Sequence, residues 1–182
     1  MSVQNWNTDV MHSEVNFKVK HMMVSTVTGT FSSFDAKVST EGEDFSSAKV
    51  EFSADINSIS TRNNDRDAHL KSDDFFNAEK FPKMTFVSKE MKKDGDDYKL
   101  VGDLTIRDTT TEVELDVEFN GIAVDPYGQT KAGFEIKGSV NRKEFGLKWD
   151  AVTEAGSVVV SDKVKIEINL QLVKVVEEGV TA

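Results

Sequence analysis

The chain has 182 residues, of which 38% are hydrophobic, so it can bury the core of one sizeable domain and is not a disordered sequence. Its formal net charge of −10 argues against nucleic acid or an anionic membrane surface as a partner, because both attract basic proteins. Cysteine is absent, which excludes disulfides, thiolate metal ligands and cysteine nucleophiles.

The N-terminus, MSVQNWNTDV, has neither the basic start nor the apolar stretch of a secretion signal. We therefore expect a cytoplasmic protein, or a periplasmic one if a leader has been removed. No stretch approaches the roughly 18 consecutive apolar residues of a membrane helix, so we expect no stable membrane insertion.

Most of the chain alternates apolar and polar residues with the period of two that is typical of half-buried β-strands. The clearest case is 111–119, where apolar residues alternate with acidic ones. In the strand predicted at 29–39, Phe31 and Phe34 have opposite parity, so we expect a bulge near Gly29. About eight strands are predicted, at 13–21, 29–39, 47–56, 84–91, 98–106, 111–119, 132–140 and 163–172.

Strands with a single apolar face can close into a barrel, which leaves no exposed sheet edge. We predict an all-β, eight-stranded antiparallel barrel, formed by one domain over 5–175 and followed by a frayed tail at 176–182. Several small residues fall on the apolar faces, where normal packing density favours larger side chains. We infer an unfilled lumen that suits an elongated apolar ligand; the small residues are Ala36, Ala48, Ala54, Ser88, Gly102, Ala132 and Gly138.

Residues 61–82 interrupt the strand pattern with a charged segment that also contains several aromatic residues. A loop of this length in a compact domain is usually functional or disordered, and its aromatic content argues against disorder. Asn63 or Asn64 is placed to cap a short helix, and Ser72 is placed to begin a second one. We predict a partly helical lid near one end of the barrel.

Few residues are candidates for chemistry, since the chain has three histidines. Asp65, Asp67 and His69 form a D-x-D-x-H pattern that is either a metal or acid–base cluster or, more commonly, a solvated charged helix. His21, at the end of a strand, is either a histidine at the edge of the core or a functional one. No phosphate-binding glycine loop, G-x-S-x-G or H-E-x-x-H motif is present.

Two arginines are candidates for holding a polar ligand head. Arg66 either forms a surface ion pair with Asp67 or, if buried at a barrel mouth, binds an anionic group. Arg142 offers the same choice. Aromatic residues near the predicted barrel ends are interpreted as plugs that also touch whatever lies inside; they are Phe75, Phe76 and Phe145.

Six motifs, in order along the chain, resemble those of one known family. They are W-N-T-D-V-M-H-S-E-V-N-F-K-V-K-H at 6–21, G-T-F-S-S-F at 29–34, R-D-A-H-L-K-S-D-D-F-F-N-A-E-K-F-P at 66–82, G-D-L-T-I-R-D at 102–108, N-R-K-E-F-G at 141–146 and V-S-D-K-V at 160–164. Together they resemble the YceI-like family of polyisoprenoid- or lipid-binding proteins over about 6–172. Asp108 stands where such proteins often have glycine.

The resemblance implies a lipocalin-like, extended antiparallel barrel whose pore holds a long isoprenoid or a similar amphiphile. It implies binding, and no catalytic residues carry over. Many members carry a secretion signal and work in the periplasm, which this chain does not match. The residues that we expect to contact the ligand are Phe17, Val19, His21, Phe34, Phe52, Ala54, Arg66, His69, Phe75, Phe76, Leu104, Phe134, Arg142 and Phe145.

Three functions remain open. The first is a carrier or store for a polyisoprenoid-type lipid, such as an isoprenoid quinone or a prenyl phosphate, without a further cofactor or metal and as a monomer or homodimer. The second is an enzyme acting on such a lipid, which would require His21 and His69 to converge with Asp65 and Asp67. The third is a stress or interaction protein that uses the barrel as a scaffold.

Overall fold

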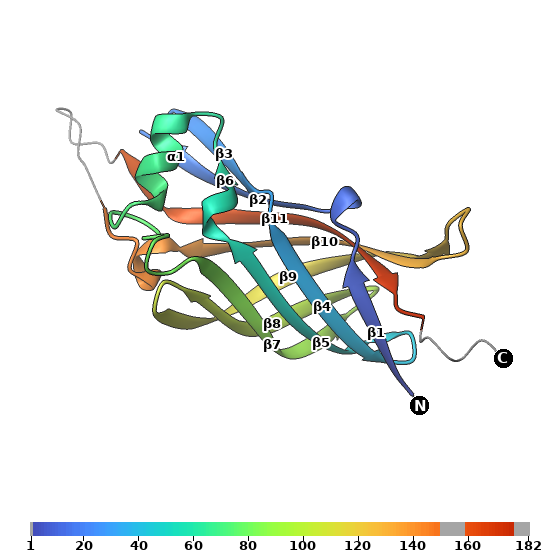
Figure 1. The fold of residues 1–182 in the computed structure, drawn as a ribbon. Coiled ribbons are helices and arrows are strands. Elements are labelled where there is room, and N and C mark those ends of the chain that lie inside the picture. The colour runs from blue at the N-terminus through green and yellow to red at the C-terminus, as the bar shows by residue number, and fades with distance from the viewer. Residues whose placement is uncertain (1, 150–158, 177–182) are drawn as a thin grey trace.

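The computed structural model describes residues 2–149 and 159–176, which form one antiparallel sheet and one α-helix (Figure 1). The strands are β1 Val3–Thr8, β2 Glu14–His21, β3 Ser25–Phe31, β4 Phe34–Glu41, β5 Asp44–Asp55, β6 Ile59–Ser60, β7 Lys83–Asp94, β8 Asp97–Ile106, β9 Thr109–Val124, β10 Thr130–Asn141 and β11 Val160–Lys174. The helix is α1 Asn64–Lys71, and the short 3₁₀ segments are η1 Val10–His12, η2 Ile56–Ser58 and η3 Arg142–Phe145.

Eight of these strands close into a barrel, in the order β1-β4-β5-β7-β8-β9-β10-β11, with β11 pairing back to β1. The other three continue barrel strands beyond a break. β1 and β2 lie end to end along β11, and β4 and β3 pair with them in the same way. β6 follows β5 and pairs with β3. The predicted eight-stranded, lipocalin-like barrel is confirmed.

We call the end that carries α1 the mouth, and the opposite end, where β4 turns into β5, the far end (Figure 1). Residues 61–82 fill the space between β6 and β7 at the mouth, as predicted for a lid. Asn63 caps α1, because its Oδ1 accepts the N–H of Arg66 at 3.0 Å. The second helix predicted at Ser72 is wrong. Instead, α1 ends here, because the N–H of Ser72 donates to the carbonyl of His69. The residues after Ser72 form turns rather than a helix.

Two strand predictions near the N-terminus also need correction. β1, which helps to close the barrel, escaped prediction because its sequence VQNWNT has only two apolar residues, Val3 and Trp6, and these have opposite parity. The strand predicted at 29–39 is two strands, β3 and β4, separated at Ser32 and Ser33. Pairing of β2 with β3 passes Gly29 without a register shift, so the expected bulge is absent there. The break at Ser32 and Ser33 shifts the alternation by one residue, which accounts for the opposite parity of Phe31 and Phe34.

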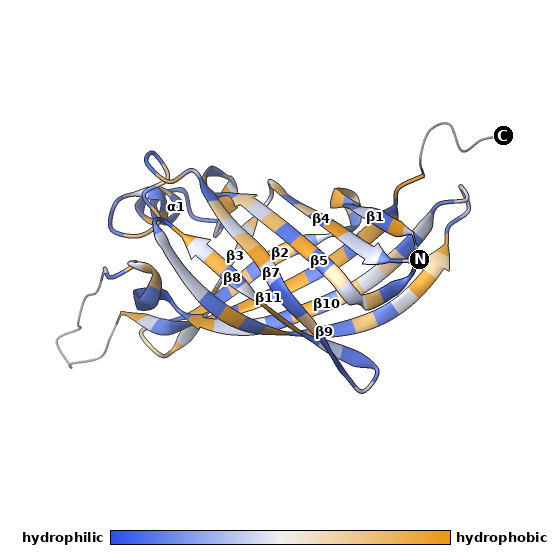
Figure 2. Ribbon diagram, turned by 90° about the horizontal axis from the view of Figure 1, so that it is seen from below, coloured by the Kyte–Doolittle hydropathy of each residue, from blue (hydrophilic) through white to orange (hydrophobic). Residues whose placement is uncertain are grey.

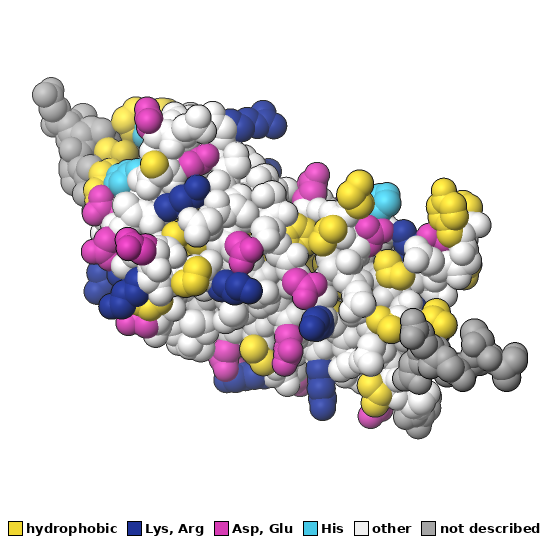
Figure 3. All heavy atoms as spheres, viewed as in Figure 1, with side chains coloured by type: hydrophobic (Ala, Val, Ile, Leu, Met, Phe, Trp, Pro, Cys, Tyr) yellow, Lys and Arg dark blue, Asp and Glu magenta, His cyan; other side chains and the backbone are white. Residues whose placement is uncertain are grey.

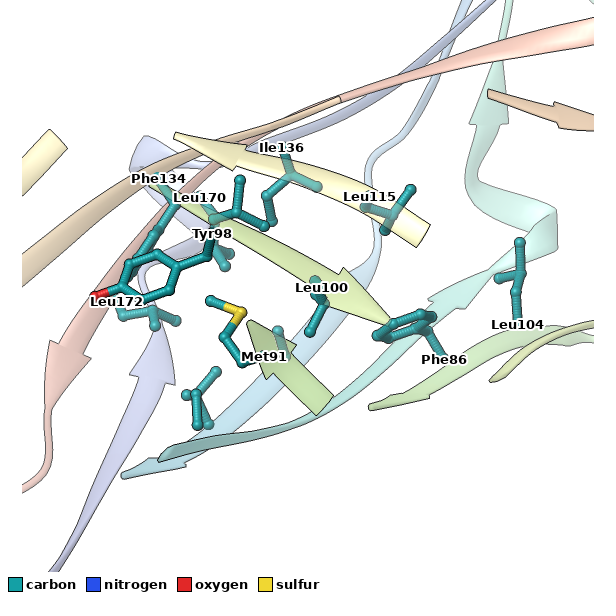
Figure 4. Packing of buried hydrophobic residues seen from close by; sticks show 14 of the residues in the cluster. Phe86, Met91, Tyr98, Leu100, Leu104, Leu115, Phe134, Ile136, Leu170 and Leu172 are labelled. Atoms are coloured by element: carbon teal, nitrogen blue, oxygen red, sulfur yellow. The ribbon is translucent and has the colours of Figure 1, made fainter. Parts of the chain in front are cut away.

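The far half of the barrel is filled by aromatic side chains. Phe45 packs against Trp6, Phe119 and Phe134 with ring centroids 4.9–5.4 Å apart. Tyr98 packs on Phe119 at 6.3 Å. Figure 4 shows Phe134, Tyr98 and Leu172 gathered together, with Phe86 and Leu104 further along the barrel. The far half is therefore a packed core.

The mouth half of the barrel is hollow. Along the inner face of β11, Val164, Ile166 and Ile168 are only half-buried, whereas Leu170 and Leu172 toward the far end are buried. β10 repeats the gradient, since Phe134 and Ile136 are buried while Val140 is half-buried. Figure 2 shows apolar and polar residues alternating along the strands, and successive side chains of a strand point to opposite faces of the sheet. The side chains at the mouth are incompletely packed because they line a space.

Apart from Ala36, which lines this space, the small inner residues from which we inferred an unfilled lumen do not mark it. A Cβ on Gly102 would lie 2.5 Å from the Phe86 ring, and one on Gly138 would lie 2.3 Å from Leu115 Cδ2. Ala132 and Ala54 are almost fully buried, at 0% and 1% exposure. These positions are small because a large neighbour fills the volume above them.

Asp9 holds the joint where β1 breaks and β2 begins. Its Oδ1 caps η1 at the N–H of Met11, and its Oδ2 accepts the Lys131 ammonium at 2.9 Å and His12 Nδ1 at 2.8 Å. Gln171 Nε2 also donates to Oδ2, at 3.3 Å. The hydrogen bond from Lys131, followed by that from His12, holds the pKa of Asp9 below its ordinary value. The carboxylate thus joins η1 to β10 and β11.

We expect Asp9→Asn to lower the free energy of unfolding by roughly 1–3 kcal/mol at neutral pH, the scale of a charge-assisted hydrogen bond. Because the folded-state pKa is lowered, this stabilisation is complete above about pH 4, the ordinary aspartate pKa, and is lost as the pH falls through the lower folded-state pKa. Urea unfolding at several pH values should show the two proteins converging in acid. A difference that stays constant down to the lowest pH would contradict the assignment.

Candidate functional site

The hollow half of the barrel encloses a chamber of about 160 Å³. Its walls are apolar side chains from the barrel strands and from the lid, with Asn16 and Arg142 as the two polar exceptions. Leu70 of α1 closes it on the mouth side together with two lid phenylalanines. Of the residues expected to contact a ligand, those that line the chamber are Phe17, Val19, Phe52, Phe75, Phe76, Leu104 and Arg142.

A second space of about 150 Å³, which we call the vestibule, lies at the mouth. It shares Phe17, Val19, Leu70, Phe75 and Val160 with the chamber, so the two spaces adjoin. Its polar lining residues are Lys20, His21, Thr61, Arg66 and His69, and none of the described residues that line it is acidic. In a chain with a net charge of −10, the lining of the vestibule thus carries two cationic side chains, Lys20 and Arg66.

Four expected contact residues line neither the chamber nor the vestibule. Phe134 belongs to the packed far half. Phe34 stacks on the Phe52 ring, with centroids 6.4 Å apart, and Ala54 lies in a satellite core beside Ile56. The alternation of apolar and polar residues predicted that these side chains face inward, but it could not show which half of the barrel is filled. The fourth, Phe145, occupies a different place.

Phe145 closes a gap in the side wall of the barrel. β9 and β10 pair only as far as Lys137 and Asp116, although β9 begins at Thr109 and β10 ends at Asn141. Between the parted strands lies a groove of about 450 Å³, and Phe145 from η3 lies at it with an exposure of 1%. We expected Phe145 to plug a barrel end, but it plugs the side.

Thr61, Arg66 and Asp67 form a compact knot at the entrance to α1. The carboxylate of Asp67 is buried and accepts the N–H of Thr61 at 2.8 Å and its hydroxyl at 2.6 Å. Arg66 donates through Nε to the same hydroxyl at 2.8 Å and through Nη2 to the Thr61 carbonyl at 2.7 Å. Arg66 and Asp67 are thus linked through Thr61. Among the described residues, none accepts a hydrogen bond from Nη1 of Arg66.

The D-x-D-x-H pattern does not assemble into a reactive cluster. His69 Nε2 lies 2.8 Å from Asp74 Oδ2, and its ring packs edge-on against Phe75 and Trp149. Asp65 is exposed, while Asp67 is committed to Thr61. His21 lines the vestibule. No group of three histidine, aspartate or glutamate side chains suited to a metal ion occurs within residues 2–149 and 159–176.

Arg142 ties the loop after β10 to the start of β11. Its guanidinium, 4% exposed, donates to the carbonyls of Leu147 at 2.7 Å, Trp149 at 2.8 Å, Ser161 at 2.9 Å and Val160 at 3.1 Å. Backbone carbonyls therefore engage its Nε, Nη1 and Nη2 nitrogens. Arg142, which we expected to hold a ligand head, is thus a clasp that orders the mouth and also lines the chamber; its contact with a ligand stays a prediction.

Arg107 is a second clasp, which the sequence did not reveal. It occupies the β8–β9 turn with φ of 56°. Its Nη1 donates to the carbonyls of Asp73 and Phe75, both at 3.1 Å, and its Nη2 meets Asp73 Oδ1 at 3.0 Å. The residue lies in the L-T-I-R-D motif noted above, but nothing in that motif shows that the arginine reaches the lid 32–34 residues away.

The fold and the two spaces define a class of single-chain antiparallel β-barrel with an apolar chamber behind a capped mouth. The YceI-like domain family matches residues 6–172, and the chain belongs to this family. A UPF0312 protein of Staphylococcus epidermidis is 42% identical over 167 residues, which are 91% of this chain and 95% of the relative. The resemblance inferred from the six motifs is confirmed.

Solved structures share the fold. The YceI protein of Campylobacter jejuni is similar with a TM-score of 0.67 and 32% identity, covering 82% of this chain and 88% of that one. A polyisoprenoid binding domain from Saccharophagus degradans is similar with a TM-score of 0.70 and 15% identity, covering 92% and 97%. At that identity the second likeness concerns the fold alone. In the described part of the chain, no helix is long and apolar enough to cross a membrane.

Replacing Arg142 tests the clasp. We expect Arg142→Lys to lower the free energy of unfolding by about 2–4 kcal/mol, because lysine keeps the charge but leaves several buried carbonyls without a donor. The matched control is Arg62→Lys, at an exposed position of the lid. Chemical unfolding of both variants measures the difference. Equal stabilities for the two variants would show that the clasp is not needed.

Proposed function

We propose that this protein binds a long amphiphilic lipid of polyisoprenoid type, as a carrier or store. The observation that carries the proposal is the junction of an apolar chamber with a cation-lined vestibule. An amphiphile needs both, since its tail gains free energy by leaving water and its head keeps polar partners. The fold neighbour from Saccharophagus degradans, described as polyisoprenoid binding, supports the same ligand class.

The vestibule favours an anionic head over a neutral one. Lys20 and Arg66 line it, and no carboxylate from the described residues does. A prenyl phosphate would therefore be bound more tightly than a prenyl alcohol of equal length. An isoprenoid quinone remains the second ligand candidate, because His21, His69 and Thr61 can hydrogen-bond to carbonyl oxygens.

The size of the chamber limits the ligand. A cavity of about 150 Å³ holds roughly one benzene molecule, so the chamber and vestibule together accept roughly two isoprene units in this conformation. Longer tails require the lid residues Leu70, Phe75 and Phe76 to move apart. Binding is thus expected to strengthen steeply over the shortest prenyl alcohols and more gradually beyond them.

Native mass spectrometry of the purified protein, followed by calorimetric titration with prenyl alcohols and prenyl phosphates of increasing length, tests the function. A co-purified isoprenoid lipid, or saturable binding that grows with tail length, supports it. If no lipid co-purifies and no prenyl compound of any length binds, the lipid-binding proposal fails.

The chamber can be filled by mutation. We expect Ile166→Trp to weaken binding of prenyl ligands by about tenfold or more while changing stability by less than about 1 kcal/mol, because the ring occupies empty volume. Ala132→Trp, in the packed half, should instead cost about 3 kcal/mol through overpacking. Titration and urea unfolding measure both effects. If Ile166→Trp destabilised the protein as much as Ala132→Trp does, the mouth half would be packed like the far half.

We expect Arg66 to distinguish a charged lipid head group from a neutral one. Arg66→Lys should weaken binding of a prenyl phosphate by roughly 1–3 kcal/mol, the scale of one charge-assisted contact, because the planar fork is lost. Binding of the matching alcohol should barely change. Arg62→Lys, on the same segment but outside the vestibule lining, is the control. Equal losses for phosphate and alcohol would assign Arg66 to the structure of the lid.

A further inference from the structure

Backbone strain is concentrated at the mouth. Five described residues other than glycine have φ between 49° and 64°, and they are Met22, Met23, Arg62, Asn77 and Arg107. All five lie in the lid or in the turns β2–β3 and β8–β9 at the mouth. At the far end, the turns that need a positive φ use Gly42, Gly95 and Gly128. Conformations that cost L-residues free energy thus occur at the end that bears the vestibule.

The turn between β2 and β3 is unusual in its side chains as well. Met22, Met23 and Val24 form its tip, with exposures of 39%, 65% and 80%. A hairpin turn with two consecutive positive φ angles is most easily made by Asn-Gly, which is polar and unstrained. Here the chain places three apolar side chains in solvent on a strained backbone. Neither folding stability nor solubility favours that choice, so a binding role explains it better.

The same hairpin forms a wall of the vestibule. Phe17, Val19, Lys20 and His21 of β2 and Val27 of β3 line that space, directly behind the tip. Figure 1 shows β2 and β3 at the end of the barrel that carries α1, and Figure 3 shows apolar side chains reaching the surface at that end. The exposed tip is therefore continuous with the proposed lipid site.

We propose that Met22, Met23 and Val24 insert into the interface of a lipid bilayer and dock the mouth there for lipid exchange. The inference rests on the proposed function, because a polyisoprenoid lipid resides in membranes. Three side chains on a protruding turn are too few for a stable protein–protein interface, which buries roughly 1,200 Å² or more. They suffice for shallow, reversible insertion, with Lys20 and Arg66 at the level of the lipid head groups.

The charge of the chain defines the kind of membrane contact. With a net charge of −10, the protein as a whole is repelled by anionic lipids, so apolar insertion must dominate. Docking on zwitterionic vesicles is therefore expected to persist at about 0.15 M salt, where surface charges are screened beyond about 8 Å. This separates the mechanism from the polybasic attachment that the composition excludes.

The test is co-sedimentation with phosphatidylcholine vesicles, with and without phosphatidylglycerol. The variant is Met22→Asn with Met23→Gly and Val24→Thr, which supplies the preferred turn sequence and removes the apolar surface. We expect its partitioning to fall about tenfold or more while its melting temperature rises, because strain is relieved. The control is Val124→Thr with Tyr127→Thr, exposed at 67% and 90% at the far end, which should bind as the wild type does.

A turn variant that partitions as strongly as the wild type overturns the proposal, as does a far-end control that loses binding instead. Wild-type protein that fails to sediment with either kind of vesicle overturns it too. Binding of prenyl phosphate in detergent solution is measured in parallel and should be unchanged in the turn variant. If the protein binds vesicles but no prenyl compound, docking is supported and the lipid-carrier function is not. If it binds prenyl compounds but no vesicles, the lipid-carrier function is supported and docking is not.

Discussion

The packed aromatic cluster in the far half is the constraint on which the rest of the barrel depends. An empty chamber of about 160 Å³ costs roughly 4 kcal/mol at ~24 cal/mol per Å³, a large share of the stability of a single domain. The burial of apolar surface that offsets this cost is concentrated around Phe45, which packs against Trp6, Phe119 and Phe134. Because strand closure and packing are secured there, the mouth half can stay hollow without loss of the fold, and a ligand that fills it returns stability to the protein.

Order at the mouth depends on a second kind of interaction, which adds to the apolar packing of buried lid residues such as Phe75 and Ala78. Two arginines donate to backbone carbonyls of the loops at the mouth, and Arg142 also donates to those of Val160 and Ser161 at the start of β11. Arg142 fixes the loop after β10, and Arg107 reaches the lid at Asp73 and Phe75. A planar guanidinium satisfies several carbonyls at once, which an apolar plug cannot do. The lid is therefore tethered to the barrel through backbone carbonyls as well as through its apolar side chains.

The alternation of residues along the strands predicted the barrel, its inner faces and the lid, because period two is a local property of the chain. What it missed depends on contacts between distant segments. β1 is defined by its partners on β4 and β11 rather than by its own pattern. Gly102 appeared to leave a void because its neighbour Phe86 is unknown until register is fixed. Likewise, the sequence could not show the backbone carbonyls that converge on the guanidinium of Arg142.

The proposed site and the proposed docking surface together impose an order on lipid exchange. In a bilayer the polar head of the lipid lies at the interface and the tail points into the membrane, away from a docked protein. In the barrel the tail must lie deep, in the chamber, with the head outside it in the vestibule. A lipid therefore cannot enter along the barrel axis head first and finish in this arrangement. One place in the wall where it can turn lies beside β6, because β6 pairs with β3 alone and residues 61–82 fill the space between β6 and β7. Opening of the lid would free a slot along that side, through which the tail can swing after the head has reached Lys20 and Arg66.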